Sequence, residues 1–251
     1  QNRMGRKGAL DDMKALVLLH GLCGSPTYFE HLEPLLNAEV HAFTLPGHAG
    51  TEVGPETMDQ FADWVMEEIR LRNLEQPLVI GHSFGGYVTT NLVRRYPEEL
   101  SGFGLMHSTA ASDSEEAKEK RNGAINKVIE EGVKPFIDGM IPNVFSKESN
   151  PALSEQAIEI GYEMSVEGVV NAQRAIRDRE DEVDTVQATE LPGLFIYGEK
   201  DPNMDETRAF LGAESHRKAI VPYSHMGMME GPEEEAEIVN QWIQEVEHGK
   251  I

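Results

Sequence analysis

Cysteine, basic residues and long apolar runs are all scarce in this sequence. A single cysteine, Cys23, excludes a disulfide framework and a cluster of thiolate metal ligands. No apolar run approaches the ~20 residues that a membrane-spanning helix needs. Residues 1–12 are polar and basic and lack the apolar core of a secretory signal, so we expect a loose N-terminal extension there. Together these features predict a cytoplasmic protein that does not act on a membrane.

Acidic residues outnumber basic residues. The chain has 44 Asp and Glu against 22 Lys and Arg, which gives a formal net charge of −22. Nucleic acids and anionic membrane surfaces select basic faces, so this charge argues against both as partners. We interpret the excess as acidic helix faces in contact with solvent, with adaptation to salt as the alternative.

Short apolar runs of strand length alternate with amphipathic helical stretches along most of the chain. This alternation is typical of a parallel sheet whose two faces are covered by helices. The predicted strands are residues 14–19, 40–44, 77–81, 102–107, 193–197 and 218–221. The predicted helices outside the middle region are residues 27–37, 57–72, 84–96, 205–211 and 233–247. The sequence therefore predicts an α/β fold with six parallel strands.

The alternation stops between residues 112 and 188, where no convincing strand occurs. Helical stretches in this region are broken by glycines and prolines, namely Gly132, Pro142, Pro151 and Gly168. The region is too long for a plain crossover connection. We therefore expect a helical cap over residues 111–188, inserted into an α/β core of residues 13–110 and 189–251.

The strongest local motif is the pentapeptide Gly81-His82-Ser83-Phe84-Gly85. It follows a predicted strand and precedes a predicted helix, so Ser83 is expected on a sharp strand-to-helix turn. The residues that flank the serine of such a turn must be very small to avoid steric clashes, which explains the two glycines. The turn exposes the serine hydroxyl at the end of the sheet and at a helix N-terminus. This context favours a nucleophile over an idle serine in a connecting turn.

Four further segments, in chain order, complete the pattern of a known family. They are His20-Gly21, Leu45-Pro46-Gly47-His48, Gly198-Glu199-Lys200-Asp201, and Ser224-His225-Met226-Gly227 followed by Glu230-Gly231-Pro232-Glu233. With the pentapeptide, these segments make the chain resemble the α/β-hydrolase superfamily from Met13 to the final helix. The resemblance implies an α/β-hydrolase fold, in which the order serine, aspartate, histidine is the usual one.

The resemblance implies a role for five residues. Ser83 is the expected nucleophile, His225 the expected general base, and Asp201 the acid that fixes the imidazole tautomer. The backbone N–H groups of Leu22 and Phe84 are expected to form the oxyanion hole.

Other histidines and the cysteine receive supporting roles. His20 is expected to brace the turn that presents the oxyanion donors, and His82 to be packed or hydrogen-bonded beside the serine. The alternative position for the acid of the triad, after the fourth strand, holds no acid, because His107 and Ser108 occupy it. Cys23 is expected to be a small apolar filler near the pocket rather than a reactive thiol. The histidines lack the spacing of metal ligands, so we predict no metal and no cofactor.

The cap is expected to roof the serine and to form the substrate pocket. The residues predicted to line the pocket are Cys23, Phe136, Met140, Ile141, Val144, Phe145, Ile160, Met164 and Met226. Those within the cap could equally form the cap's own core. Arg121, Arg174 and Arg177 could recognise a substrate carboxylate, although ion pairs with neighbouring acidic residues are favoured.

These features predict a serine hydrolase, carboxylesterase-like, that acts on a small-molecule ester as a monomer or homodimer. Lactonase, thioesterase and carbon–carbon bond hydrolase remain open because they share the same triad. Ser83 excludes the haloalkane dehalogenases and epoxide hydrolases of the fold, which need an aspartate at this position. Few residues precede Met13 to form the β-hairpin of most capped relatives, so a lyase of the compact type is the runner-up. A ligand receptor without turnover is the alternative outside enzymes.

Overall fold

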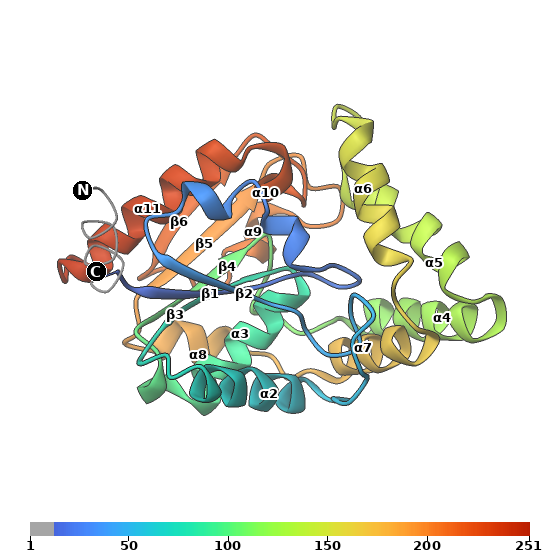
Figure 1. The fold of residues 1–251 in the computed structure, drawn as a ribbon, viewed down its shortest axis with the longest axis horizontal. Helices are drawn as coiled ribbons and strands as arrows, with labels where there is room; N and C mark the ends of the chain where they lie inside the picture. Colours follow the sequence, from blue (N-terminus) through green and yellow to red (C-terminus); the bar gives the residue numbers. More distant parts are fainter. Residues whose placement is uncertain (1–12) are drawn as a thin grey trace, which may run out of the picture.

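The structure, a computed structural model, describes residues 13–251, and the extension expected over residues 1–12 lies outside the described residues. Six strands form one parallel sheet in the order β2-β1-β3-β4-β5-β6 (Figure 1). The strands are β1 (Ala15–Leu19), β2 (Glu39–Phe43), β3 (Leu78–His82), β4 (Gly102–Met106), β5 (Gly193–Gly198) and β6 (Arg217–Val221). All six predicted strands are confirmed, each to within one residue at either end.

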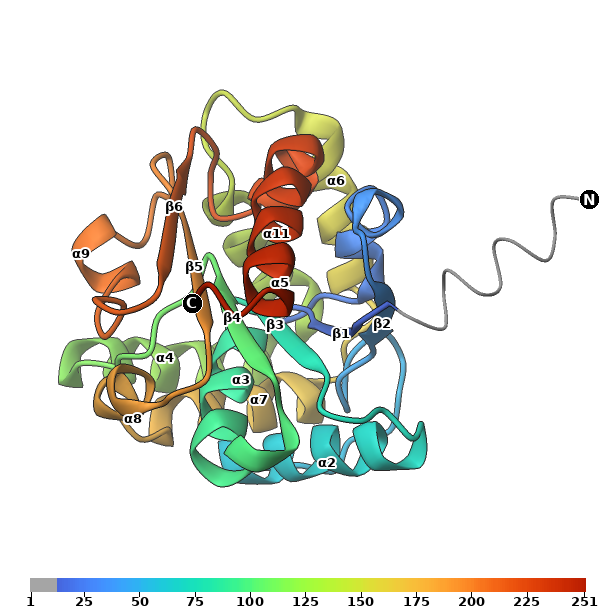
Figure 2. The same cartoon turned by 90° about the vertical axis from the view of Figure 1, so that its left-hand side faces the viewer.

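Helices cover both faces of the sheet. Alternate residues of each strand point to opposite faces, so each strand contributes apolar side chains to two cores. The core helices are α2 (Met58–Leu71), α3 (Phe84–Arg95), α9 (Glu206–Ala209), α10 (Gly227–Glu230) and α11 (Pro232–Glu247). Val17 of β1 belongs to the apolar core that includes α2 and α3, whereas its neighbour Leu16 belongs to the core that includes α11. Figure 2 shows α11 on one side of the sheet and α2 and α3 on the other. None of the helices described between residues 13 and 251 is both long and apolar enough to cross a bilayer.

The predicted helix over residues 27–37 is wrong. Two short 3-10 helices, η1 (Pro26–Phe29) and η2 (Glu33–Leu35), occupy this stretch instead. Pro34 has no N–H to donate, and in an α-helix its ring would clash with the carbonyl four residues earlier. The helix predicted over residues 205–211 is present but shortened to the four residues of α9.

Helices alone connect β4 to β5. They are α4 (Glu115–Glu131), α5 (Val133–Met140), η4 (Ile141–Val144), α6 (Pro151–Gly161), α7 (Val166–Asp178) and α8 (Val183–Ala188), of which α4, α5 and α6 gather at one side of the sheet in Figure 1. Gly132 separates α4 from α5 with a φ of 87°. The helix break predicted at Gly168 is wrong. It lies in the first turn of α7, where an added Cβ would come within 2.6 Å of the Gly47 carbonyl oxygen, so its missing side chain lets α7 approach the loop after β2.

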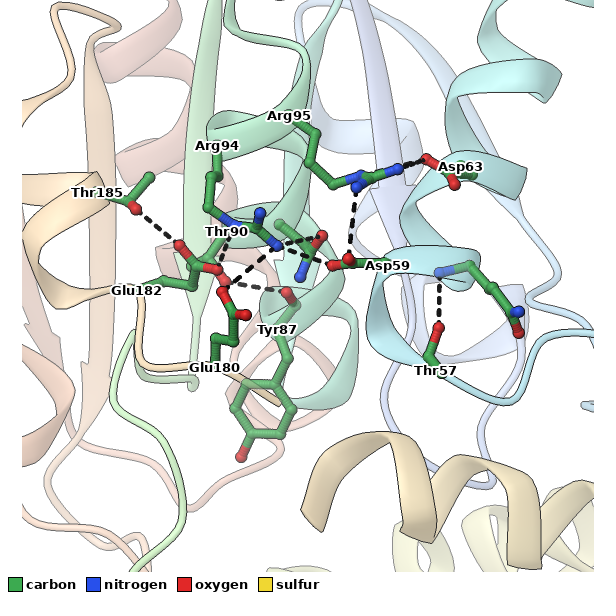
Figure 3. Close-up of polar contacts among 12 residues, drawn as sticks. Thr57, Asp59, Asp63, Tyr87, Thr90, Arg94, Arg95, Glu180, Glu182 and Thr185 are labelled. Carbon is green, nitrogen blue, oxygen red and sulfur yellow. Dashed lines mark hydrogen bonds and ion pairs between the residues drawn. The ribbon is translucent and has the colours of Figure 1, made fainter. Parts of the chain in front are cut away.

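Ion pairs hold the C-terminal end of α3 between α2 and the start of α8 (Figure 3). Arg94 donates through Nη2 to Asp59 Oδ1 at 2.8 Å and through Nε to Glu182 Oε1 at 2.7 Å. The Glu182 side chain is only 4% exposed, so this ion pair is largely shielded from water. Arg95 pairs with Asp63 and also with Asp59, whose side chains are 45% and 49% exposed. These contacts anchor the helix that follows the candidate nucleophile.

Replacing Arg94 by methionine is expected to lower the free energy of unfolding by about 2 kcal/mol, because the buried Glu182 carboxylate loses its charged donor. Arg95→Met is the matched control on the same helix. It removes ion pairs with two exposed carboxylates and should cost at most about 1 kcal/mol. Urea unfolding followed by circular dichroism measures both changes. Equal losses in the two variants would contradict the argument from burial.

Candidate active site

Ser83 joins β3 to α3 in a strained backbone conformation. Its φ is 49° and its ψ is −113°, a combination that a serine keeps only where the surrounding structure enforces it. A Cβ on Gly81 would lie 2.0 Å from the Gly85 carbonyl oxygen, and a Cβ on Gly85 would lie 2.2 Å from the Leu19 carbonyl oxygen. The two glycines of the pentapeptide are therefore required by the close approach of β3, α3 and β1.

Three side chains that follow β3, β5 and β6 meet at this turn. His225 Nε2 lies 2.8 Å from Ser83 Oγ, and His225 Nδ1 lies 2.6 Å from Asp201 Oδ2. An ionised carboxylate can only accept a hydrogen bond, so Nδ1 carries a proton and donates it to Asp201. In the neutral ring, Nε2 then accepts a hydrogen bond from the Ser83 hydroxyl. The structure thus brings together three residues that lie far apart in the sequence.

Asp201 is a buried carboxylate with several donors. Its side chain is inaccessible to solvent, and Oδ1 accepts hydrogen bonds from the backbone N–H groups of Asn203 at 2.9 Å and Met204 at 3.2 Å. Burial by itself raises the pKa of Asp201, but the hydrogen bond and electrostatic attraction of the His225 imidazole, with the hydrogen bond from the Asn203 N–H, outweigh burial and hold this pKa below its usual range. Asp201 therefore stays ionised beside the imidazole.

The loop that carries His225 is anchored on both sides. His82 Nε2 donates to the His225 carbonyl oxygen at 2.9 Å. Burial lowers the pKa of His82 well below its ordinary value, so this ring is a neutral donor. On the other side, the Ser224 N–H donates to Glu230 Oε1 at 3.0 Å, and the Ser224 hydroxyl donates to the same oxygen. These contacts hold the imidazole in place relative to the serine.

Two residues with unpaired backbone N–H groups line the cavity beside Ser83. They are Leu22 and Phe84, and among residues 13–251 no acceptor is found for either N–H group. Phe84 is the first residue of α3, where a helix leaves its initial N–H groups without partners. Leu22 lies in a turn that the Gly24 N–H closes by donating to the Gly21 carbonyl oxygen at 3.0 Å. An oxyanion formed at Ser83 would be an acceptor of the kind that these two donors lack.

His20 holds the turn that contains Leu22. Its Nδ1 lies 2.9 Å from the Gly21 carbonyl oxygen, and its Nε2 lies 3.0 Å from the Leu45 backbone nitrogen. A carbonyl only accepts and an N–H only donates, so Nδ1 is protonated and Nε2 is not. Burial, and then the neighbouring His48, lower the pKa of His20 to about 3, which keeps the ring neutral. His20 thereby ties the Leu22 turn to the loop after β2.

A cavity of about 530 Å³ opens beside Ser83 and His225. Four residues predicted for the pocket line its wall, namely Met140, Ile141, Val144 and Met226. The other residues predicted for the pocket lie outside the wall and pack in the apolar core, namely Cys23, Phe136, Phe145, Ile160 and Met164. Burial also raises the pKa of the Cys23 thiol, which keeps the thiol protonated and unreactive.

The cavity wall also contains residues that no sequence motif marked. They are Tyr28, Tyr87, Thr109, Asp113, Ser114, Ala117, Ile176, Asn203, Met204 and Arg208. Among the three arginines predicted for the cap, Arg121 lines the wall, Arg177 pairs with Asp178 at 2.8 Å, and Arg174 is exposed elsewhere. In the part of the chain that the structure describes, no three His, Cys, Asp or Glu side chains group in a way that could hold a metal ion.

A second buried pair lies beside the candidate site. His107, after β4, is hydrogen-bonded through Nε2 to Glu235 Oε1 of α11, and neither side chain is exposed. The ring centre of His107 lies 6.4 Å from that of His225. Burial by itself lowers the pKa of His107, but the Glu235 carboxylate outweighs burial and raises this pKa above its ordinary value. The sequence contained no indication that His107 and Glu235 form this pair.

The Glu235→Gln variant is expected to lose stability most strongly at low pH. Because folding raises the pKa of His107, the stabilisation by the pair is fully present below the unfolded-state value of about 6.5 and is lost as the pH rises through the folded-state value. The free energy of unfolding should therefore fall furthest below that of the parent near about pH 6, and the gap should narrow toward about pH 9. Urea unfolding at both pH values measures the gap, with the exposed Glu233→Gln as control. A gap that does not depend on pH would contradict a raised pKa of His107 in the folded protein.

Known proteins share this fold. The pimeloyl-[acyl-carrier protein] methyl ester esterase of Neisseria meningitidis is 26% identical over 231 residues, which cover 80% of this chain and 82% of that protein. The enzyme of the same name from Aromatoleum aromaticum is 35% identical over 88 residues, so the chain covers only 34% of that relative's length. A thermophilic esterase from Thermogutta terrifontis, solved with malate bound, has a TM-score of 0.86 and 26% identity over 93% of this chain and 90% of that chain.

A sequence profile also places most of the chain in one family. The sequence profile described as the alpha/beta hydrolase family matches residues 16–238. This range includes all six strands apart from the first residue of β1, the strained serine turn, and the two residues hydrogen-bonded in series to that serine. The chain therefore belongs to the alpha/beta hydrolase family.

Proposed function

We propose that this protein is a serine hydrolase that cleaves carboxylic esters of small to medium size through an acyl-enzyme intermediate. The observation that carries the proposal is the hydrogen-bond chain from Asp201 through His225 to the Ser83 hydroxyl, at the wall of a cavity of about 530 Å³. A cavity of this size is in the range of small-molecule sites. The esterases among the similar proteins support ester hydrolysis over the other reactions that such a triad can perform.

Each half of the reaction uses the same groups. The Ser83 oxygen attacks the ester carbonyl carbon while His225 Nε2 takes the hydroxyl proton. The carbonyl oxygen becomes an oxyanion and accepts the N–H groups of Leu22 and Phe84. His225 returns the proton to the alcohol, which leaves, and Ser83 keeps the acyl group. Water then attacks the acyl carbon by the same route, the carboxylic acid leaves, and the serine hydroxyl is restored, while Asp201 stays ionised and stabilises the imidazolium.

A fluorophosphonate probe followed by peptide mapping tests the nucleophile. We expect covalent labelling of Ser83, because among the serines of residues 13–251 only its hydroxyl is hydrogen-bonded to a histidine that can take its proton. Ser108 and Ser114 also line the cavity and serve as internal controls. Labelling of either of these, or no labelling, would contradict the proposal.

A panel of p-nitrophenyl esters from acetate to decanoate then tests ester hydrolysis. We expect the highest kcat/KM for short and medium acyl groups, because the cavity is of limited volume and partly apolar. Hydrolysis of lactones without hydrolysis of linear esters would narrow the reaction to cyclic esters. Labelling of Ser83 without any turnover, together with strong stabilisation by a ligand, would favour a receptor instead.

A further inference from the structure

Two arginines share one carboxylate in the cavity wall. Arg121 of α4 donates to both oxygens of Asp113, through Nε and Nη2, and Arg179 donates to Asp113 Oδ1 through Nη1 at 2.9 Å. Arg179 is only 8% exposed, and its Nη2 donates to the Ala111 carbonyl oxygen at 2.8 Å. Its guanidinium carbon lies 3.8 Å from the centre of the Tyr87 ring, which itself lines the cavity. Asp113 therefore balances only one of two fixed positive charges.

Arg208, on α9, adds another positive charge to the same wall. Its Nη2 donates to the Ser112 carbonyl oxygen at 3.0 Å, and no carboxylate oxygen among residues 13–251 lies within 4 Å of its guanidinium nitrogens. Its backbone is held on both sides, because its N–H donates to Asp205 Oδ1 and its carbonyl accepts from Thr109 Oγ1, each at 2.8 Å. Arg208 is thus a positioned, half-buried cation without a carboxylate partner.

This part of the wall is positive although the protein as a whole is strongly negative. The residues that line this wall include two arginines, Arg121 and Arg208, against one aspartate, Asp113, which leaves an excess of one positive charge in a chain with 44 acidic and 22 basic residues. Two further carboxylates, Asp181 and Asp205, lie close by but outside the cavity lining, where each keeps its charge and accepts a hydrogen bond from a backbone N–H, of Ser112 and of Arg208 respectively. Uncompensated charges in a partly buried wall cost free energy unless an anion binds there.

We propose that the cavity takes esters that carry a second, ionised carboxylate, and that this carboxylate binds Arg208. The inference rests on the proposed function, because the ester group must lie at Ser83. A guanidinium binds a carboxylate through paired N–H donors, and Arg208 has donors left for such a pair. Met140 and Ile141 in the same wall suit the apolar chain between the two groups. The substrate class is therefore the half-esters of dicarboxylic acids.

Monomethyl esters of straight-chain dicarboxylic acids, from succinate to suberate, test this assignment against dimethyl esters of the same acids. For the best chain length, the parent protein is expected to show a kcat/KM about 10- to 100-fold higher for the monomethyl ester, as a charge-assisted hydrogen-bonded pair predicts. Arg208→Gln should bring this ratio close to one, chiefly by raising KM for the charged ester. Arg174→Gln removes an exposed arginine outside the wall and should leave the ratio unchanged.

Equal kcat/KM for charged and neutral esters in the parent, or an unchanged ratio in Arg208→Gln, would overturn the assignment. In that case hydrolysis of p-nitrophenyl esters would still support the proposed function, so the two failures are distinguishable. If no ester turns over, calorimetry with monomethyl adipate and the Ser83→Ala protein decides the question. We expect measurable binding there, weakened about 10- to 100-fold when Arg208→Gln is added, whereas equal binding with and without Arg208 would end the inference.

Discussion

Alanine in place of Ser83 is expected to lower kcat for ester hydrolysis by about 10⁶-fold. The substitution removes the oxygen that lies 2.8 Å from His225 Nε2, so no atom remains to form the acyl-enzyme. Alanine keeps the Cβ of serine, so the turn keeps its shape and its strain. Steady-state hydrolysis of p-nitrophenyl butyrate measures the loss, and circular dichroism checks that the variant is folded.

The His225→Ala variant and the double variant are the controls for this result. The serine and the histidine act as a unit, so the double variant should lose about as much activity as either single variant. Additive losses would mean that the two side chains act in separate steps. A Ser83→Ala protein that keeps kcat within about a hundredfold of the parent would rule out Ser83 as the nucleophile.

The Asp201→Asn substitution is expected to lower kcat by about 10⁴-fold through the tautomer of His225. The Asn203 and Met204 N–H groups donate to Oδ1, so the amide oxygen of asparagine would take that position. The amide NH₂ would then face His225 Nδ1, which could only accept. Nε2 would carry the ring proton and could no longer take the proton of Ser83. The hydrolysis rate at saturating ester measures the loss.

Asp205→Asn is the matched control for this substitution. Asp205 precedes α9 and caps it by accepting from the Arg208 N–H at 2.8 Å, and asparagine caps a helix about as well as aspartate. The control removes one negative charge near the site without touching His225, so the rate with an uncharged ester should stay close to that of the parent. An Asp201→Asn protein with a rate within about tenfold of the parent would exclude the tautomer mechanism.

The local features of the fold could be predicted well because they depend on neighbours in the sequence. Apolar runs of strand length predicted the six strands, since both faces of a parallel sheet are buried. The serine turn was predictable because only glycine fits at positions 81 and 85, where a Cβ would meet backbone oxygens. The predicted helix over residues 27–37 was wrong. Its prediction followed the apolar pattern, although Pro34, which disfavours a continuous α-helix, was a local signal against it.

Side-chain partners from distant segments could not be predicted in the same way. Nothing in the sequence around Glu235 indicates that its carboxylate lies buried against His107. Most of the predicted pocket residues are apolar, a character that cavity walls and packed cores share, so the sequence could not separate Met140 from Met164. No sequence motif contains Arg208. Its importance comes from its position in the cavity wall, where its guanidinium has no carboxylate partner among residues 13–251.

The sequence by itself determined the order of strands and helices along the chain, the strained turn at Ser83, and the family pattern that singled out Asp201 and His225. The tertiary structure decided which side chains meet, because the parallel strands bring the loops that follow them to one edge of the sheet. There it set the hydrogen-bond series at Ser83, the composition of the cavity wall, and the excess of positive charge within a negative protein. Local patterns encode burial and turns, whereas distances between remote side chains arise only when the whole chain has folded.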